Sequence, residues 1–255
     1  IERFEATVER LRQHYAIEGV TSAVISHGDL VQTGGYGYAL NAPAKRVTAD
    51  TVFSAQSLTK PLFAYLVLRL AQANKLDLDT PLCQYLNTSY IAHDQRGDQI
   101  TARQVLSHSC GLPNWRRPEI GLQFVCNPGT HFSYSGEGYC YLQLAVESLM
   151  EDTIEAQLQP VLSELFMSNS SMQVLEQDHI FREFFPLLNS NVAFALMTTA
   201  KDYARFIQQM LNTSDTIAQQ MLQPQIKVGK QPLSWGLGWG LMPTGAHNHA
   251  FLHWG

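Results

Sequence analysis

The hydrophobic and polar positions of this chain change along its length between helical and strand-like spacing. An amphipathic helix is predicted over residues 2–17, where apolar side chains recur on one helical face. Two runs rich in β-branched and aromatic residues follow at 20–26 and 30–38. His27-Gly28-Asp29 lies between these runs and is a strong hairpin signal. The start of the chain therefore predicts a helix followed by a hairpin.

The remainder of the chain alternates loops with further apolar segments. Helices are predicted over 80–86, 101–107, 137–150, 153–166 and 199–212, and strands over 235–242 and 249–253. Because strands lie at both ends, we expect an α+β fold in which an antiparallel sheet, with its first and last strands meeting, is flanked by helices and an all-helical lobe. A single domain would cover residues 1–255, with a sheet subdomain at about 1–55 and 230–255 and a helical lobe at about 56–229.

Composition narrows the classes of protein. With 255 residues, of which 45% are hydrophobic and 15% charged, the chain is long enough to bury a sizeable core. A net charge of −5 argues against a nucleic-acid partner, and no apolar stretch reaches the length of a membrane span. The four cysteines permit disulfides, with Cys110 and Cys126 as the most plausible pair, but we expect free and mostly buried thiols.

Ser57 and Lys60 are the first candidates for chemistry. Pro61 follows them, and because proline is tolerated in the first turn of a helix, an apolar helix is expected to begin close to Ser57. The spacing of three residues places both side chains on one helical face. Ser57 would then be a nucleophile and Lys60 its proton acceptor, since burial and the helix dipole would both lower the lysine pKa. The alternative is a solvated lysine on the first turn of an ordinary helix.

Tyr134 is the second candidate, on the glycine-flanked segment Ser133-Tyr134-Ser135-Gly136. Close to a lysine ammonium, its phenol would ionise more easily and could accept the serine proton. The alternative is a turn of tyrosine and glycine packed on the core.

The third candidate is the terminal run His253-Trp254-Gly255. His253 could donate a hydrogen bond to a substrate carboxylate or leaving group, and Gly255 would let a substrate backbone approach the strand edge. His247, His249 and His253 also share strand parity, as zinc ligands on one face would. No nearby Asp, Glu or Cys completes that set, and we expect no metal.

The order Ser-x-x-Lys, Tyr-Ser-x and His-x-Gly resembles the serine β-lactamase and penicillin-binding-protein superfamily. Within it, the chain is most similar to the class C β-lactamase-related branch, which includes esterases and D-amino-acid peptidases. The resemblance covers essentially the whole chain. Further blocks that match are 19–38, 76–82, 100–113, 197–202 and 235–239. The resemblance implies a β-lactamase/transpeptidase-like fold, whose final strand and C-terminal helix are missing from this sequence.

The resemblance also implies roles for individual residues. Ser57 would attack an acyl carbonyl, and Lys60 and Tyr134 would share the base function. The backbone N–H of Ser57 would supply half of an oxyanion hole, and the residue after Gly255 would supply the other half. A structural role is implied for His108.

Two positions depart from the family's pattern. Gly136 stands where the pattern has an asparagine, so the amide that would hold a β-lactam side chain is missing. His253 stands where the Lys-Thr-Gly motif has its lysine, while Trp254 and Gly255 complete that motif. The expected substrate-binding residues are thus Gly136, Trp254 and Gly255.

The predicted function is a serine hydrolase that acts through a covalent acyl-enzyme on an ester, an amide or a D-amino-acid peptide. Carboxylesterase or D-peptidase action is favoured over true β-lactamase action. The alternative is a non-catalytic or slowly turning over β-lactam-binding or scaffold protein of the same fold. We expect a small-molecule or peptidoglycan-like substrate and no cofactor. Because the sequence starts at Ile1 without an initiator methionine, a periplasmic or secreted location is favoured, and a cytoplasmic one stays open.

Overall fold

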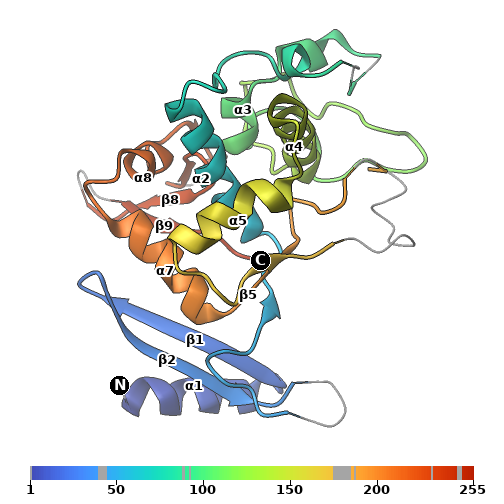
Figure 1. Ribbon diagram of the computed structural model, residues 1–255. Helices are drawn as coiled ribbons and strands as arrows, with labels where there is room; N and C mark the ends of the chain where they lie inside the picture. The colour runs from blue at the N-terminus through green and yellow to red at the C-terminus, as the bar shows by residue number, and fades with distance from the viewer. Residues whose placement is uncertain are drawn as a thin grey trace.

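Helices and short antiparallel sheets make up the fold (Figure 1). The computed structural model describes residues 2–39, 45–87, 90–91, 93–174, 185–186, 188–230, 232–245 and 249–255. Over these ranges, none of the helices is both long enough and apolar enough to span a lipid bilayer.

A hairpin begins the fold after one helix, as the sequence predicts. α1 (Glu2–His14) precedes β1 (Gly19–Ser26) and β2 (Asp29–Gly37), which pair antiparallel. At the turn, His27-Gly28 adopts positive φ angles of 53° and 87°, which suit a two-residue hairpin loop. α1 packs on β2, and α7 (Ala200–Leu211) packs on both strands.

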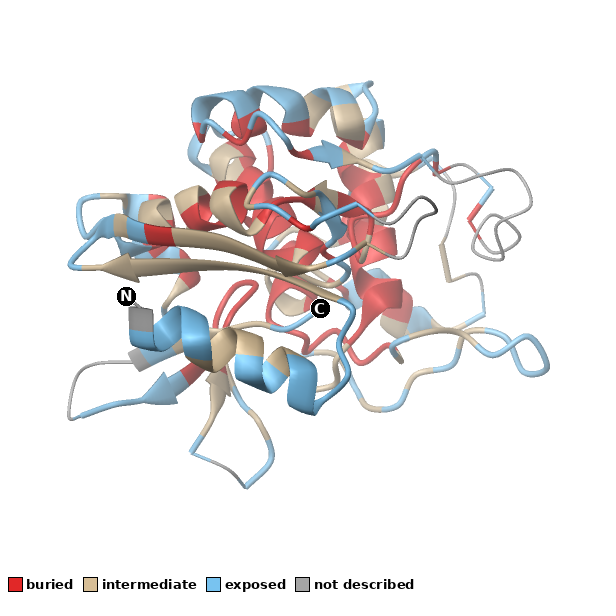
Figure 2. Ribbon diagram, turned by 90° about the horizontal axis from the view of Figure 1, so that it is seen from below, coloured by how far each residue is buried: buried red, intermediate tan, exposed pale blue. Residues whose placement is uncertain are grey.

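Two buried helices form the centre of the core. Figure 2 shows that buried residues concentrate in the helical part of the molecule, whereas α1 exposes much of its surface. α2 (Thr59–Gln72) starts without a side-chain cap and carries Pro61 in its first turn, where the sequence places it. α4 (Gly136–Met150) begins directly after the N-cap Ser135, whose hydroxyl accepts the Gly138 N–H. Within the described residues, the other helices are η1 (Leu82–Tyr85), η2 (Gln95–Gln99), α3 (Ala102–Leu106), α5 (Ile154–Glu164) and α8 (Thr216–Met221).

The later strands form two further sheets. The first has the order β3 (Phe53–Ser54), β5 (Leu196–Thr198) and β4 (Ser171–Met172). The second runs in chain order through β6 (Ile226–Lys227), β7 (Ser234–Trp235), β8 (Gly240–Pro243) and β9 (His249–Leu252). Antiparallel pairing is confirmed in all three sheets. In the described ranges the hairpin pairs with neither later sheet, so the expected meeting of the first and last strands is wrong. The division into a sheet subdomain and a helical lobe stays a prediction.

The single strand predicted over 235–242 is also wrong, because a buried turn separates β7 from β8. The Gly236 N–H donates to the Trp239 carbonyl at 2.8 Å. Gly238 has a φ of 91°, a conformation that other residues rarely adopt, and its N–H donates to the Leu106 carbonyl at 2.9 Å. The glycines thus let an apolar run fold back on itself and contact the end of α3.

Candidate active site

Ser57 and Lys60 meet at the start of α2. Successive i→i+3 hydrogen bonds hold the preceding turn, from the N–H groups of Leu58, Thr59 and Lys60 to the carbonyls of residues 55–57. Lys60 Nζ lies 3.0 Å from Ser57 Oγ, so the two side chains are within hydrogen-bond reach. Ser57 is half-buried, while Lys60 is only 1% exposed. The alternative of a solvated lysine is therefore wrong.

Burial determines the protonation of Lys60. Removal of the amine from water lowers its pKa from 10.5 to about 7. Nζ also donates to the Ala193 carbonyl at 2.7 Å. A neutral amine can make that donation with one hydrogen while its lone pair faces Ser57 Oγ. The geometry thus gives Ser57 a proton acceptor near neutral pH.

The loop that carries the Ala193 carbonyl was not predicted as part of the site. Side chains of α4 and of the loop itself hold it: Gln143 Nε2 donates to the Ser190 carbonyl at 2.9 Å, and Gln143 Oε1 accepts the Val192 N–H at 3.0 Å. Asn191 Oδ1 accepts the Ala193 N–H at 2.8 Å. No periodicity or motif at 190–193 signals this role, because the contact joins residues that are 133 positions apart.

Tyr134 lies beside the same pair. Its ring centroid is 4.9 Å from Lys60 Nζ, and its hydroxyl hydrogen-bonds with the Ser57 side chain. Burial raises the pKa of Tyr134 to about 12, and the hydrogen bond with Ser57 opposes only part of this rise. The expectation of a more easily ionised phenol is therefore wrong, because burial of the phenol itself disfavours its charged form.

His108 holds the tyrosine loop in place. Its carbonyl accepts the Ser133 N–H at 2.7 Å and its Nδ1 accepts the Ser135 N–H at 3.0 Å. Its ring stacks on Tyr134, with the ring centroids 4.1 Å apart. Burial, with smaller contributions from Lys60 and His253, lowers the pKa of His108 well below its usual value. This neutral, fully buried imidazole clamps both sides of Tyr134, in keeping with a structural role.

His253 comes to the site from the end of β9. Its ring centroid is 6.2 Å from that of Tyr134. Nδ1 lies 2.8 Å from the Trp254 carbonyl, which can only accept, so Nδ1 carries the proton. Burial, then the nearby Lys60, lower the pKa of His253 to about 4. Nε2 is buried without a partner in the described structure and is an acceptor at neutral pH, whereas the expected role was that of a donor.

The other predicted substrate-binding residues lie around this centre. Trp254 is 62% exposed. Gly255 lies against the chain that leads to the nucleophile, since a Cβ added there would be 2.2 Å from the Ala55 carbonyl oxygen. Gly136 is the first residue of α4, and its N–H donates to Asn114 Oδ1 at 3.0 Å.

Metal and disulfide chemistry receive no support from the described residues. They contain no group of three or more His, Cys, Asp or Glu side chains that could hold a metal ion. His247 lies outside the described residues, and so does the side chain of His249. The four cysteines are free, and Cys110 and Cys140 are buried.

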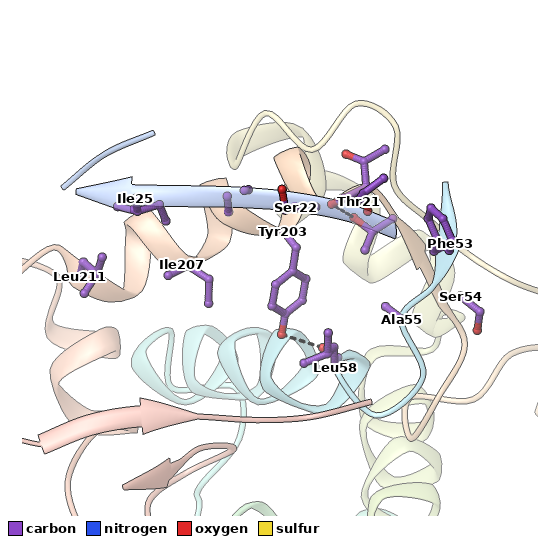
Figure 3. Close-up of a pocket in the computed structure, with 15 residues that line it drawn as sticks. Thr21, Ser22, Ile25, Phe53, Ser54, Ala55, Leu58, Tyr203, Ile207 and Leu211 are labelled. Atoms are coloured by element: carbon purple, nitrogen blue, oxygen red, sulfur yellow. Dashed lines mark hydrogen bonds between the residues drawn. The ribbon is translucent and has the colours of Figure 1, made fainter. Parts of the chain in front are cut away.

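A large apolar cavity lies close to this site without containing its polar residues (Figure 3). It has a volume of about 680 Å³ and lies between β1, the start of α2 and α7. Tyr203 points across it from α7 and donates to the Leu58 carbonyl at 2.9 Å. Leu58 lines the cavity, but its neighbour Ser57 does not.

A serine and a lysine at the start of a buried helix, together with antiparallel sheets and a tyrosine loop, define a β-lactamase/transpeptidase-like fold. The chain belongs to the β-lactamase family, whose sequence profile matches residues 4–255.

Among curated proteins, the chain is 30% identical over 196 residues to penicillin-binding protein 4 of Amycolatopsis lactamdurans, covering 71% of this chain and 50% of that protein. It is 28% identical over 115 residues to esterase EstB of Burkholderia gladioli, covering 44% of this chain and 29% of that protein. The chain thus matches half or less of the length of these relatives.

Solved structures share the fold. A class C β-lactamase superposes with a TM-score of 0.77 at 21% identity, covering 94% of this chain and 73% of that chain. The octameric penicillin-binding protein homologue from Pyrococcus abyssi gives 0.76 at 19% identity, covering 95% and 65%. The family and these relatives support a serine-hydrolase-like function in general terms.

Proposed function

We propose that this chain is a serine acyl hydrolase. Ser57 would form a covalent acyl-enzyme with an ester, an amide or a D-amino-acid peptide and then release the acyl group to water. The observation that carries this proposal is the 3.0 Å contact between Ser57 Oγ and a buried lysine amine whose pKa is about 7. Such a pair meets the usual requirement of an activated nucleophile, namely an adjacent base within hydrogen-bond reach.

Lys60 is the proposed first base. As Ser57 Oγ bonds to the acyl carbon, its proton passes to the neutral amine of Lys60. The carbonyl π electrons move to the oxygen, which becomes an oxyanion, and the Ser57 N–H at the start of α2 is a proposed donor to it. When the tetrahedral intermediate collapses, the leaving alcohol or amine departs with one proton. Tyr134, which stays protonated well above neutral pH, is suited to relay that proton from Lys60. Water then attacks the acyl-enzyme by the reverse sequence, which restores Ser57.

The charge state of the site favours neutral substrates. His253 takes the place of a lysine and stays neutral above pH 4 or so, so this strand offers no fixed cation to a substrate carboxylate. Carboxylesterase or neutral amidase action is therefore favoured over the cleavage of anionic β-lactams.

Hydrolysis of p-nitrophenyl acetate and butyrate tests the proposal. We expect turnover by this chain, loss of turnover in Ser57→Ala, and retention in Ser54→Ala, an exposed serine three residues earlier. A fluorophosphonate probe should label Ser57, which peptide mass mapping would locate. If the folded wild type and Ser57→Ala are equally inactive, the proposed hydrolase function is refuted. Trapping of a labelled penicillin on Ser57 without turnover would favour the binding-protein alternative.

A further inference from the structure

Lys60 has no charged partner in the described part of the chain. Its amine takes part in none of the ion pairs found there. Burial raises the pKa of the phenols and the thiol that face the amine and lowers the pKa of the imidazoles, so all of these groups are neutral at pH 7: Tyr134, Tyr139, Cys140, His108 and His253. The Ala193 carbonyl, 2.7 Å from Nζ, is thus the group that favours one orientation of the amine.

Asn191 holds the chain on both sides of this carbonyl. Its Oδ1 accepts the Ala193 N–H at 2.8 Å. Its main-chain carbonyl accepts the N–H groups of Phe194 and Ala195 at 3.2 and 2.9 Å. The residue is fully buried, with no measurable exposure. The position of the Ala193 carbonyl therefore depends on the orientation of one buried carboxamide.

A thiol of α4 orients that carboxamide. Asn191 Nδ2 donates to Cys140 Sγ at 3.2 Å. Because the Ala193 N–H requires an oxygen acceptor, the amide nitrogen must face the sulfur. Cys140 and Gln143 are three residues apart on α4, so one face of this helix contacts the loop at both points. The raised pKa of Cys140 keeps the thiol neutral, so it acts as an acceptor and not as a counter-ion.

We propose that Asn191 and Cys140 are positioning residues for Lys60, through which α4 determines the orientation of the amine and how tightly it holds its proton. For its effect on rate, this inference rests on the proposed acyl-hydrolase function. Charge-assisted hydrogen bonds are about twice as strong as neutral ones, so a fixed carbonyl binds the ammonium more strongly than the amine. If the carbonyl is released, Lys60 should lose its proton more easily.

Direct titration of the amine tests this inference without any substrate. In protein labelled with ¹³C at lysine Cε, the NMR signal of Lys60 is identified by its absence from Lys60→Met. Its titration midpoint should move to lower pH by about one pH unit in Asn191→Ala and by about half a pH unit in Cys140→Ala. Cys140→Ser, whose hydroxyl can accept from the amide, should restore the wild-type midpoint. Cys83→Ala removes a half-buried thiol in η1 and is the matched control, with an unchanged midpoint.

The double variant tests whether the thiol acts through the carboxamide. With both Asn191 and Cys140 replaced by alanine, the midpoint should move no further than in Asn191→Ala alone, because the two residues share one route to Lys60. A sum of the two single shifts would overturn that route. If Asn191→Ala does not fold, Cys140→Ala, which only replaces a thiol with hydrogen, decides the question by itself.

The pH profile of hydrolysis separates positioning from a merely structural role. With p-nitrophenyl acetate, the midpoint of the rise in kcat/KM should follow the NMR midpoint in both single variants. The plateau of kcat/KM should fall by about tenfold in Asn191→Ala, because the amine is less well oriented toward Ser57. A merely structural contribution would lower the plateau and leave the midpoint in place, which would overturn the inference.

The outcomes also distinguish this inference from the proposed function. If the NMR midpoint is unchanged in the folded alanine variants while the wild type hydrolyses esters, the positioning role is refuted and the hydrolase stands. If the wild type hydrolyses no ester but the NMR midpoints move as expected, the proposed function fails and the positioning of Lys60 by Asn191 and Cys140 stands.

Discussion

Replacement of Lys60 by methionine should stabilise the protein while removing its activity. The lysine is 1% exposed, and burial lowers its pKa from 10.5 to about 7. At pH 7 an unfolded chain holds the proton on this amine, whereas the folded chain holds it only half of the time. The folded state is therefore disfavoured, and methionine has a similar length without an amine to desolvate.

The magnitude follows from the change in pKa. At about 1.4 kcal/mol per tenfold change in proton affinity, the desolvated amine costs about 4 kcal/mol of folding free energy at pH 7. Methionine removes this cost, but it also leaves the buried Ala193 carbonyl without its donor. The unpaired acceptor offsets about 1–3 kcal/mol of the stabilisation. We expect Lys60→Met to raise the free energy of unfolding by about 1–3 kcal/mol at pH 7.

The pH dependence gives a sharper test. Between the folded pKa of about 7 and the unfolded value of 10.5, the unfolded state binds more protons, so the wild type gains stability as pH rises. Below pH 7 the full cost is present, and above 10.5 it is gone. The advantage of Lys60→Met should therefore shrink by about 2 kcal/mol between pH 7 and pH 9.

Guanidinium unfolding, followed by tryptophan fluorescence at both pH values, measures this difference. When wild type and variant are compared at the same pH, groups that the substitution does not affect contribute equally to both free energies of unfolding, so their titration cancels in the difference. Lys75→Met, which removes an exposed lysine shortly after α2, controls for the loss of a positive charge. A stability difference between wild type and variant that is the same at pH 7 and pH 9, or one that widens, would contradict a lowered pKa of Lys60.

Three further predictions follow from the site and its surroundings. Tyr134→Phe should keep the fold by circular dichroism and lower kcat/KM for p-nitrophenyl acetate by about 10²–10⁴, because the proton relay is lost; an unchanged rate would exclude Tyr134 from proton transfer. Arg116→Met should lower the free energy of unfolding, measured in urea, by about 3–5 kcal/mol, because the Glu137 carboxylate stays buried without its guanidinium partner. Adding Glu137→Gln should recover part of this loss, and a double variant without recovery would show that the buried charge is not its cause. The logarithm of kcat/KM should rise with pH up to about 7 and then level off, since only the neutral amine of Lys60 accepts a proton; a profile that is flat from pH 5 to 9 would rule out Lys60 as the base.

Local signals in the sequence predict much of the fold. The hairpin turn at His27-Gly28 and the start of α2 before Pro61 depend on residues with restricted or permissive backbone conformations, so neighbours in sequence determine them. The run 235–242 fails as a prediction because its apolar periodicity suits a strand while Gly236 and Gly238 permit a turn. Only contacts with α3 and α8 decide between these two conformations.

The candidate site divides in the same way. Ser57 and Lys60 are three residues apart, so helical geometry alone brings them together. The Ala193 carbonyl could not be predicted, because it reaches the site from a loop whose position depends on long-range hydrogen bonds. The protonation of Tyr134 was predicted in the wrong direction, since it depends on burial that no local pattern reports.

The Lys60 amine donates to a main-chain carbonyl at Ala193, and this decides which substitutions the site tolerates. Residue 193 can change its side chain without losing the contact, as long as the new one fits the core. Substitutions of Gln143 and Asn191 should be more harmful, because their amide side chains hydrogen-bond to the backbone of this loop and hold it in place. Substitutions that disrupt the hydrogen bond of Lys60 should therefore be sought at these two amide side chains, which lie outside every motif that marks the nucleophile.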